Sequence, residues 1–230
     1  MRRRGAAAAR PGIPRGVEIA AALAGLVAAA PVIAAAAAAI VLTTGEFPFF
    51  RQRRIGRHAR PFTLVKLRTM RKGTHGAPVT ARDDARVTRV GALLRRTKVD
   101  ELPELWNVLR GDMAFVGPRP EVPRYVDPGD PRWARVLAAP PGLTDPVTLR
   151  LRNEEELLAG VGGDREVFYR AHLQPWKLRG YAAYLDRRTW RTDLRVLLET
   201  ARAVVRPAKA PPPSIDDILA DRLQTRPDAR

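Results

Sequence analysis

The sequence contains no cysteine, which excludes both a disulfide framework and a thiolate metal site. Its histidines, at positions 58, 75 and 172, are scattered and show no metal-ligand spacing. The glycines at positions 160–163 do not form a phosphate-binding loop, because they lack the strand-to-helix setting that such a loop needs. No zinc-finger, RNP or basic-zipper signature is present, so we predict no nucleic acid partner.

Acidic residues are few compared with basic ones: 24 Asp and Glu stand against 41 Lys and Arg, a net charge of +17. Such a charge favours anionic partners, whether nucleic acid, an acidic membrane or phosphorylated substrates. A bias toward Ala, Arg and Pro in the whole sequence is the alternative explanation. The length of 230 residues suits one domain with appendages.

Charged residues are missing altogether from positions 19–42, a run of 24 residues that is long enough to cross about 30 Å of hydrocarbon. A signal peptide and a plain transmembrane anchor are two interpretations of it. Pro31 favours a kink in the middle, and both flanks are basic, which favours keeping both ends on the cytoplasmic side. We therefore predict a re-entrant helix that breaks at Pro31. The flanking arginines are Arg2, Arg3, Arg4, Arg10, Arg15, Arg51, Arg53, Arg54, Arg57 and Arg60.

Four segments are expected along the chain: a basic tail (1–16), the membrane helix (17–44), a catalytic domain (45–205) and a disordered tail (206–230) with a short helix near 215–223. Within the third segment, residues 62–65 are typical of a short strand. Leu102, Leu105 and Leu109 give one apolar helical face, with Gly111 as its stop signal. Positions 194–205 are typical of an amphipathic helix.

The most informative motif is Lys98-Val-Asp100-Glu101-Leu-Pro-Glu, followed by Gly117-Pro-Arg119-Pro-Glu. The side chains of adjacent residues do not project in the same direction. The two carboxylates are therefore better suited to separate roles at a phosphate than to acting as the facing acid/base pair of a glycosidase. One of them can attack phosphorus while the other holds a metal. Arg119 lies between two prolines, which fix its backbone for gripping an anion.

Simpler interpretations stay open from the residues alone. Asp100 lies at or just before a helix N-terminus, so it can be an N-cap, and Glu101 can be a first-turn partner of the helix dipole. Arg119 can be a surface arginine in a proline-rich turn.

The stretch from Lys98 to Glu121 resembles the signature of the bacterial sugar transferases, the monotopic polyprenyl-phosphate phosphoglycosyl transferases, in their minimal form. Two further blocks match in order and spacing: Phe49-Phe-Arg-Gln-Arg-Arg-Ile-Gly followed by Pro61-Phe-Thr-Leu-Val-Lys-Leu-Arg-Thr-Met, and Asp83-Asp-Ala-Arg-Val-Thr-Arg-Val-Gly-Ala-Leu-Leu-Arg. The resemblance runs from about residue 17 to about residue 205.

The resemblance implies an α+β, mainly helical fold: a re-entrant membrane helix, then a small cytoplasmic catalytic domain with short strands and interfacial amphipathic helices. It implies that Asp100 is a covalent nucleophile and Glu101 its acidic partner, both beside Mg²⁺. The positions that match phosphate-binding or active-site basic residues are Arg119, Arg95, Lys66 and Arg68.

The reaction implied is transfer of a sugar-1-phosphate from a UDP-sugar to polyprenyl (undecaprenyl) phosphate, with release of UMP. It would take place at the cytoplasmic face of the bacterial inner membrane, as the first membrane step of exopolysaccharide, capsule or O-antigen synthesis. A homodimer and a different diphosphate donor are left open. Thr144-Asp145-Pro146 departs from the family pattern, so the sugar is not identified. The alternative is a non-catalytic, membrane-tethered basic protein that binds anionic lipid or nucleic acid.

Overall fold

A computed structural model describes residues 10–73, 84–152, 154–205 and 212–223. Helices dominate and the strands are short, which confirms the expected mainly helical α+β class. The helices are α1 (Arg15–Thr44), α2 (Arg89–Thr97), α3 (Glu104–Arg110), α4 (Pro131–Val136), α5 (Pro146–Arg150), α6 (Glu154–Ala159), α7 (Arg165–Phe168), α8 (Gln174–Arg187), α9 (Trp190–Val205) and α10 (Ile215–Leu223). The strands are β1 (Phe49–Ile55), β2 (Pro61–Leu67), β3 (Ala114–Val116) and β4 (Gly142–Thr144).

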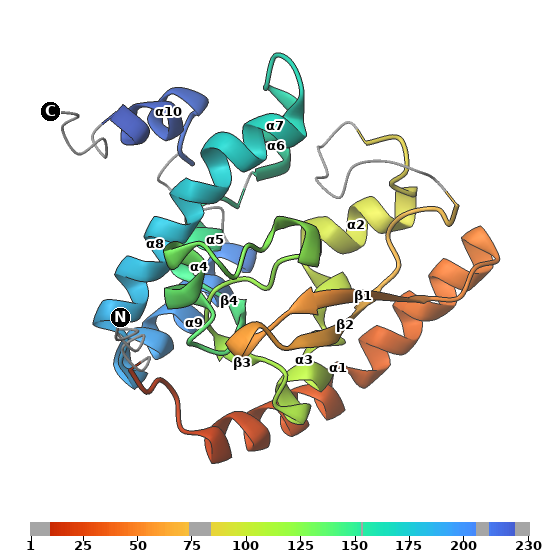
Figure 1. Cartoon of the computed structure of the whole chain (residues 1–230). Helices are drawn as coiled ribbons and strands as arrows, with labels where there is room; N and C mark the ends of the chain where they lie inside the picture. The colour runs from red at the N-terminus through yellow and green to blue at the C-terminus, as the bar shows by residue number, and fades with distance from the viewer. Residues whose placement is uncertain (1–9, 74–83, 153, 206–211, 224–230) are drawn as a thin grey trace, which may run out of the picture.

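The strands form two separate pairs. Strands β1 and β2 make an antiparallel hairpin in which Phe49 lies opposite Leu67, and the strand expected at 62–65 falls within β2. Strands β3 and β4 pair in parallel through Ala114 and Gly142. The hairpin lies above α1 in Figure 1, and β2 contacts that helix, so the hairpin is built directly onto it.

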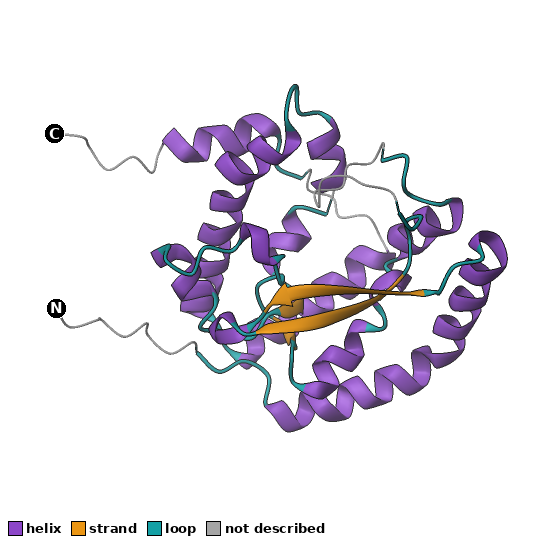
Figure 2. Ribbon diagram, turned by 45° about the vertical axis from the view of Figure 1, so that its right-hand side comes forward, coloured by secondary structure: helices purple, strands orange, loops and turns teal. Residues whose placement is uncertain are grey.

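Helix α1 runs along one side of the molecule and exposes most of its apolar surface. It continues through Pro31, so the helix is not broken there as the sequence predicts; Figures 1 and 2 show α1 as one continuous, curved helix. By length and composition α1 is able to cross a membrane, and only 6% of its most apolar window is buried. Val27 is 70% exposed and Leu42 is 85% exposed. A continuous exposed apolar surface such as that of α1 marks an interaction site.

Both ends of α1 are attached to the same body. At the N-terminal end, Arg15 Nη2 donates to the carbonyl oxygen of Val108 at 2.5 Å, and Glu18 Oε1 accepts the backbone N–H of Phe115 at 3.0 Å. At the C-terminal end, Ile40 is buried in a cluster with residues of β2 and α2. The helix therefore lies against the rest of the chain near both of its ends rather than extending away from it.

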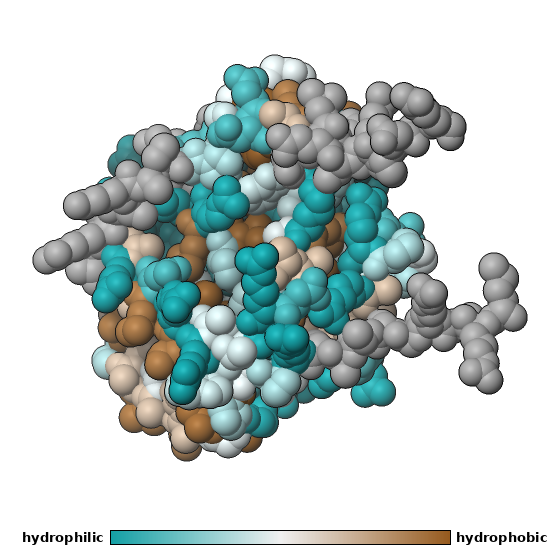
Figure 3. Space-filling model, turned by 90° about the vertical axis from the view of Figure 1, so that its left-hand side faces the viewer, coloured by the Kyte–Doolittle hydropathy of each residue, from teal (hydrophilic) through white to brown (hydrophobic). Residues whose placement is uncertain are grey.

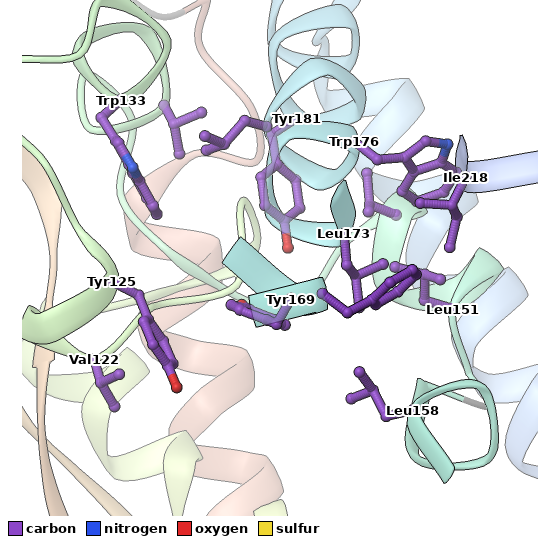
Figure 4. Packing of buried hydrophobic residues seen from close by; sticks show 14 of the residues in the cluster. Val122, Tyr125, Trp133, Leu151, Leu158, Tyr169, Leu173, Trp176, Tyr181 and Ile218 are labelled. Atoms are coloured by element: carbon purple, nitrogen blue, oxygen red, sulfur yellow. The ribbon is translucent and has the colours of Figure 1, made fainter. Parts of the chain in front are cut away.

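The largest hydrophobic core lies among α4, α6, α7, α8 and α10, and Figure 4 shows its packing. Its members include Trp133, Leu158, Leu173, Trp176 and Ile218. The short helix expected in the C-terminal tail is present as α10, and its Ile218 is buried in this core. Residues 206–211 and 224–230 of the same tail lie outside the described residues, as do Arg2, Arg3, Arg4 and His75.

The amphipathic helix expected at 194–205 is confirmed as part of α9. Its Trp190, Leu194 and Leu198 are each about half exposed, and arginines lie between them along the helix. On the face drawn in Figure 3, apolar residues gather at the lower edge, the side on which Figure 1 places α1, whereas the middle of that face is mainly hydrophilic.

Candidate active site

The site is built on the contact between α3 and β2, and Asn107 makes that contact. Its side chain is buried; Oδ1 accepts the backbone N–H of Val65 at 3.1 Å, and Nδ2 donates to the carbonyl oxygen of Thr63 at 2.7 Å. Nδ2 also donates to Asp112 at 3.2 Å. Because one amide bonds to two backbone groups of the same strand, it fixes where α3 lies along β2. Lys66, which follows Val65 in β2, is thereby held beside the start of α3.

A sharp turn between α2 and α3 carries the two adjacent carboxylates. Lys98 ends α2 with a left-handed backbone (φ 59°), a 3₁₀ turn follows over Val99–Glu101, and α3 starts at Glu104. Asp100 therefore lies just before a helix, as the sequence predicts. It does not cap that helix, because no side-chain cap bond is made at the N-terminus of α3. Asp100 is 7% exposed, and its Oδ1 is buried without a hydrogen-bond partner among the described residues.

Glu101 is in a different position, since two cations meet at one of its oxygen atoms. Lys66 Nζ lies 2.9 Å from Glu101 Oε1, and Arg119 Nη2 donates to the same oxygen at 2.6 Å. Lys66 Nζ also forms an ion pair with Glu104 Oε1 at 2.8 Å. Glu101, Glu104, Lys66 and Arg119 thus form one partly buried cluster from three separate parts of the chain, which we call the ion cluster.

The ion cluster separates the pKa values of the neighbouring carboxyl groups. Burial alone would raise the pKa of Glu101, but Arg119 and Lys66 hold that pKa well below its ordinary value. Burial and the adjacent Glu101 charge raise the pKa of Asp100, against the opposing effect of Lys66. Burial also raises the pKa of Glu104. Glu101 is therefore paired with two cations, whereas Asp100 is partly desolvated and its Oδ1 is unpaired within the described residues.

Close backbone packing between β3 and β4 sets the position of Arg119. Gly117 and Gly142 approach so closely that a Cβ on Gly142 would lie 2.0 Å from the Gly117 nitrogen. The Gly117 N–H donates to the carbonyl oxygen of Thr144, and the Gly142 N–H donates to that of Pro118, both at 3.0 Å. These contacts hold the loop immediately before Arg119, and only glycine leaves room for them.

A second set of contacts holds the chain after Arg119. Arg54 Nη1 in β1 donates to the carbonyl oxygen of Pro120 at 2.8 Å, and the backbone N–H of Ile55 donates to the carbonyl oxygen of Glu121 at 2.9 Å. The Glu121 carboxylate accepts a short hydrogen bond from the hydroxyl of Tyr169. The loop is thus fixed on both sides of Arg119, and the guanidinium needs little further ordering to bind an anion.

The remaining basic residues expected at the site are Arg95 and Arg68, and their surroundings differ. Arg95 Nη1 lies 2.8 Å from Glu155 Oε1, and its Nε donates to Thr69 Oγ1 at 2.9 Å. Burial raises the pKa of Asp100, and the Arg95 charge is one of those that oppose this rise. Arg68 lies beyond the end of β2 and donates instead to the carbonyl oxygen of Phe47 at 2.8 Å. The structure brings Lys66 and Arg119 together and places the Arg68 contacts elsewhere.

Three buried polar residues near the site were not singled out for a role from the sequence. Glu104, three residues after Glu101, joins the ion cluster, and this helical spacing was the available signal. Asn107 orders β2 against α3. Asp145 is fully buried and caps α5 by accepting the backbone N–H groups of Val147 and Thr148 at 2.7 and 2.8 Å. The departure at positions 144–146 therefore builds a helix cap.

The donor set at the site suits a hard cation that also binds substrate phosphates. Within the described residues, no group of three or more His, Cys, Asp or Glu side chains forms a complete metal site. Mg²⁺ needs only one or two protein carboxylates when phosphate oxygens and water supply the other ligands. Asp100 Oδ1, which is buried and has no partner in the part of the chain described, is such a donor. The residues fit Mg²⁺ in this limited sense.

Comparison with known proteins identifies the family. A family model described as bacterial sugar transferase matches residues 10–207. A Bacillus subtilis protein with the provisional name undecaprenyl-phosphate N-acetylgalactosaminyl 1-phosphate transferase is 45% identical over 117 residues, which are 50% of this chain and 65% of that protein. A Caulobacter vibrioides protein named UDP-glucose:undecaprenyl-phosphate glucose-1-phosphate transferase is 37% identical over 186 residues, or 76% of this chain and 63% of the relative. The chain thus spans less than two thirds of both relatives. A third relative, exopolysaccharide production protein ExoY of Sinorhizobium fredii, is 31% identical over 71% of this chain and 78% of its own length.

The two adjacent carboxylates should differ in their effect on stability. Glu101→Gln should lower the free energy of unfolding at pH 7 by about 2 kcal/mol, because it leaves two partly buried cations without their shared anion. The native contribution of Glu101 exists above its unfolded pKa and is lost as pH falls through its lowered folded pKa. Asp100→Asn should leave stability unchanged or raise it, because it removes a charge that burial disfavours.

Denaturant titrations of both variants in the same detergent measure this difference. Equal destabilisation by the two substitutions would contradict the division of the pair into a paired and an unpaired carboxylate.

Proposed function

The chain belongs to the bacterial sugar transferase family, and we propose that it transfers a sugar-1-phosphate from a UDP-sugar to polyprenyl phosphate, releasing UMP. Relatives whose names specify undecaprenyl phosphate as the acceptor support the acceptor class. The name of a third relative, exopolysaccharide production protein, supports a role of the product in surface glycan synthesis.

One observation carries the proposal: Asp100 is buried beside the ion cluster and keeps an oxygen atom without a partner among the described residues. A structural aspartate at that position would cap α3 or pair with a cation. Asp100 does neither through Oδ1. A desolvated carboxylate oxygen next to fixed cations suits attack on a phosphorus atom.

In the first step, a carboxylate oxygen of Asp100 attacks the β-phosphorus of the UDP-sugar. A bond forms between that oxygen and phosphorus, and the bond from phosphorus to the oxygen bridging the α-phosphate breaks. UMP leaves with the bridging oxygen and its electron pair, and a phosphosugar-aspartate remains. This attack requires the ionised carboxylate; burial and the Glu101 charge raise the pKa of Asp100, whereas the charges of Lys66, Lys98 and Arg95 oppose that rise.

In the second step, a phosphate oxygen of the polyprenyl phosphate attacks the same phosphorus. The aspartyl oxygen–phosphorus bond breaks, which regenerates the Asp100 carboxylate and gives a polyprenyl diphosphate sugar. Arg119 is suited to hold the phosphates in both steps. It uses Nη2 for Glu101, and its Nε and Nη1 make no hydrogen bond within the described part of the chain. A planar guanidinium with free donors can bind phosphate oxygens in pairs.

Mg²⁺ belongs to the same proposal. Glu101 would hold it through Oε2, which has no hydrogen bond within the described residues, together with phosphate oxygens of the donor, and Asp100 would contribute the carboxylate oxygen that does not attack. When bound, the ion would offset negative charge on the diphosphate. Lys66 and Arg119 keep Glu101 ionised throughout, since they hold its pKa low.

We also propose that α1 enters the membrane from the cytoplasmic face and returns to it. A helix that spanned the bilayer would separate its ends by about 30 Å of hydrocarbon. Instead, Arg15 and Glu18 at one end and Ile40 near the other both contact the domain that follows α1. The exposed Trp190 and Leu194 of α9 suit an interfacial helix beside it.

Loss of the Asp100 anion should abolish the first step. In nanodiscs without acceptor, the native protein should release UMP from at least one member of a panel of nucleotide-sugars, and Asp100→Asn should reduce that release by several orders of magnitude. Asp186→Asn, a matched change at a carboxylate that is 63% exposed, should have little effect. The native rate should fall at acid pH as Asp100 becomes protonated, around a pKa above the ordinary value of an aspartate.

Near-native UMP release by Asp100→Asn would exclude the covalent route. A native protein that processes no donor, with or without added Mg²⁺, would favour the non-catalytic, lipid-binding alternative.

The two ends of α1 should lie on the same side of the membrane. The native chain has no cysteine, so single cysteines can be placed at the exposed positions Arg10 and Arg53. In spheroplasts, neither Arg10→Cys nor Arg53→Cys should react with an impermeant thiol reagent, and both should react after permeabilisation. Pro31→Leu removes the helix-breaking residue and should move part of the Arg10→Cys population to the outer side. Labelling of Arg10→Cys in intact spheroplasts that keep Pro31 would instead show a spanning helix.

A further inference from the structure

An apolar groove lies between the second half of α1 and the end of α2. Pro31, Val32 and Ala35 line one wall, and Leu93 of α2 lines the other. The groove has a volume of about 510 Å³, which is within the range of about 300–1,000 Å³ typical of ligand sites. Leu93 and Val32 are each about half exposed, so the groove is open to the outside.

The groove reaches the 3₁₀ turn that carries Asp100 and Glu101, which we call the reactive turn, because Val99, one of its lining residues, directly precedes Asp100. Pro31, Val32 and Ala35, which also line it, are exposed residues of the apolar helix α1. The groove therefore connects the apolar side of the molecule with the carboxylate proposed to react.

A cation stands where the groove meets the turn. Lys98 is exposed, has a left-handed backbone and directly precedes Val99. No hydrogen bond or ion pair of its ammonium group is found within the described residues, yet its charge acts on both Asp100 and Glu101. A phosphate monoester bound beside Val99 would lie near Lys98 and Asp100, which flank Val99 in the chain.

We propose that the groove binds the isoprenoid tail of the polyprenyl phosphate acceptor, starting from its phosphate end, and that Lys98 binds the phosphate. The inference rests on the proposed function and adds the place of the acceptor. Of the two substrates, only the acceptor joins a long branched hydrocarbon to a phosphate. Aliphatic walls followed by a cation match that order of groups, and they position an acceptor phosphate oxygen for the second step.

Filling the groove should weaken acceptor binding without removing the first step. Ala35→Phe places a large side chain at an exposed lining position, and Ala34→Phe makes the same change at an exposed position of α1 that does not line the groove. In nanodiscs of fixed lipid composition, Ala35→Phe should raise the KM for polyprenyl phosphate by about tenfold or more. Ala34→Phe should keep the native KM.

Two further variants separate the parts of the site. Val32→Phe, at another exposed lining position, should act like Ala35→Phe and covers the case in which that variant does not fold. Lys98→Gln should raise the KM for polyprenyl phosphate, while a neutral polyprenol should inhibit this variant and the native protein equally.

The donor-only assay distinguishes failure of this inference from failure of the proposed function. If the native protein releases UMP but Ala35→Phe and Val32→Phe keep the native acceptor KM, the groove does not bind the tail. If Ala34→Phe impairs acceptor use as much as Ala35→Phe, or if the blocking variants change only lipid association or oligomeric state, the groove is occupied by bulk lipid or by a second copy, and the inference is wrong. Absence of UMP release from native protein would overturn the proposed function itself.

Discussion

The meeting of Lys66 and Arg119 at one oxygen of Glu101 is the interaction on which the candidate site depends. It joins a strand, a turn and a loop that are far apart in sequence, and it commits one carboxylate of an adjacent pair to structure. Burying these charges costs several kcal/mol for each ion unless their geometry is fixed in advance. Asn107 fixes β2 against α3, and the close approach of Gly117 to Gly142 fixes the loop of Arg119. Asp100 is left unpaired beside this ordered cluster.

The attachment of α1 to the domain that carries the ion cluster also determines how the protein can associate with a membrane. Helix α1 is apolar enough to span a bilayer, yet hydrogen bonds and packing attach it to the catalytic part near both ends. The exposed residues of α1 and α9 and the groove between α1 and α2 therefore belong to one arrangement with the reactive turn. A soluble nucleotide and a lipid phosphate can meet there only if the turn lies close to the membrane surface, which is where this packing would hold it.

Local patterns in the sequence predicted what depends on local physics. The β2 strand, the helix after Asp100 and the short α10 helix follow from apolar periodicity and stop signals. The freedom of Asp100 did not follow, because capping depends on whether its oxygen meets an N–H group in the folded chain. The family resemblance assigned both Lys66 and Arg68 to the site, but β2 ends at Leu67, and the Arg68 side chain donates to the Phe47 carbonyl oxygen instead. The Arg95 partner, Glu155, lies in α6 and could not be inferred from local sequence.

We propose that Asp100, not the neighbouring carboxylates, carries the sugar phosphate between donor and acceptor. This proposal is tested most directly by mixing native protein with a UDP-sugar that supports UMP release, without acceptor, and locating the adduct by rapid quenching and mass spectrometry. The account predicts one phosphosugar on Asp100, lost on addition of polyprenyl phosphate and absent from Asp100→Asn. An adduct on Glu101 or Glu104, or UMP release that requires the acceptor and leaves no adduct, would contradict it.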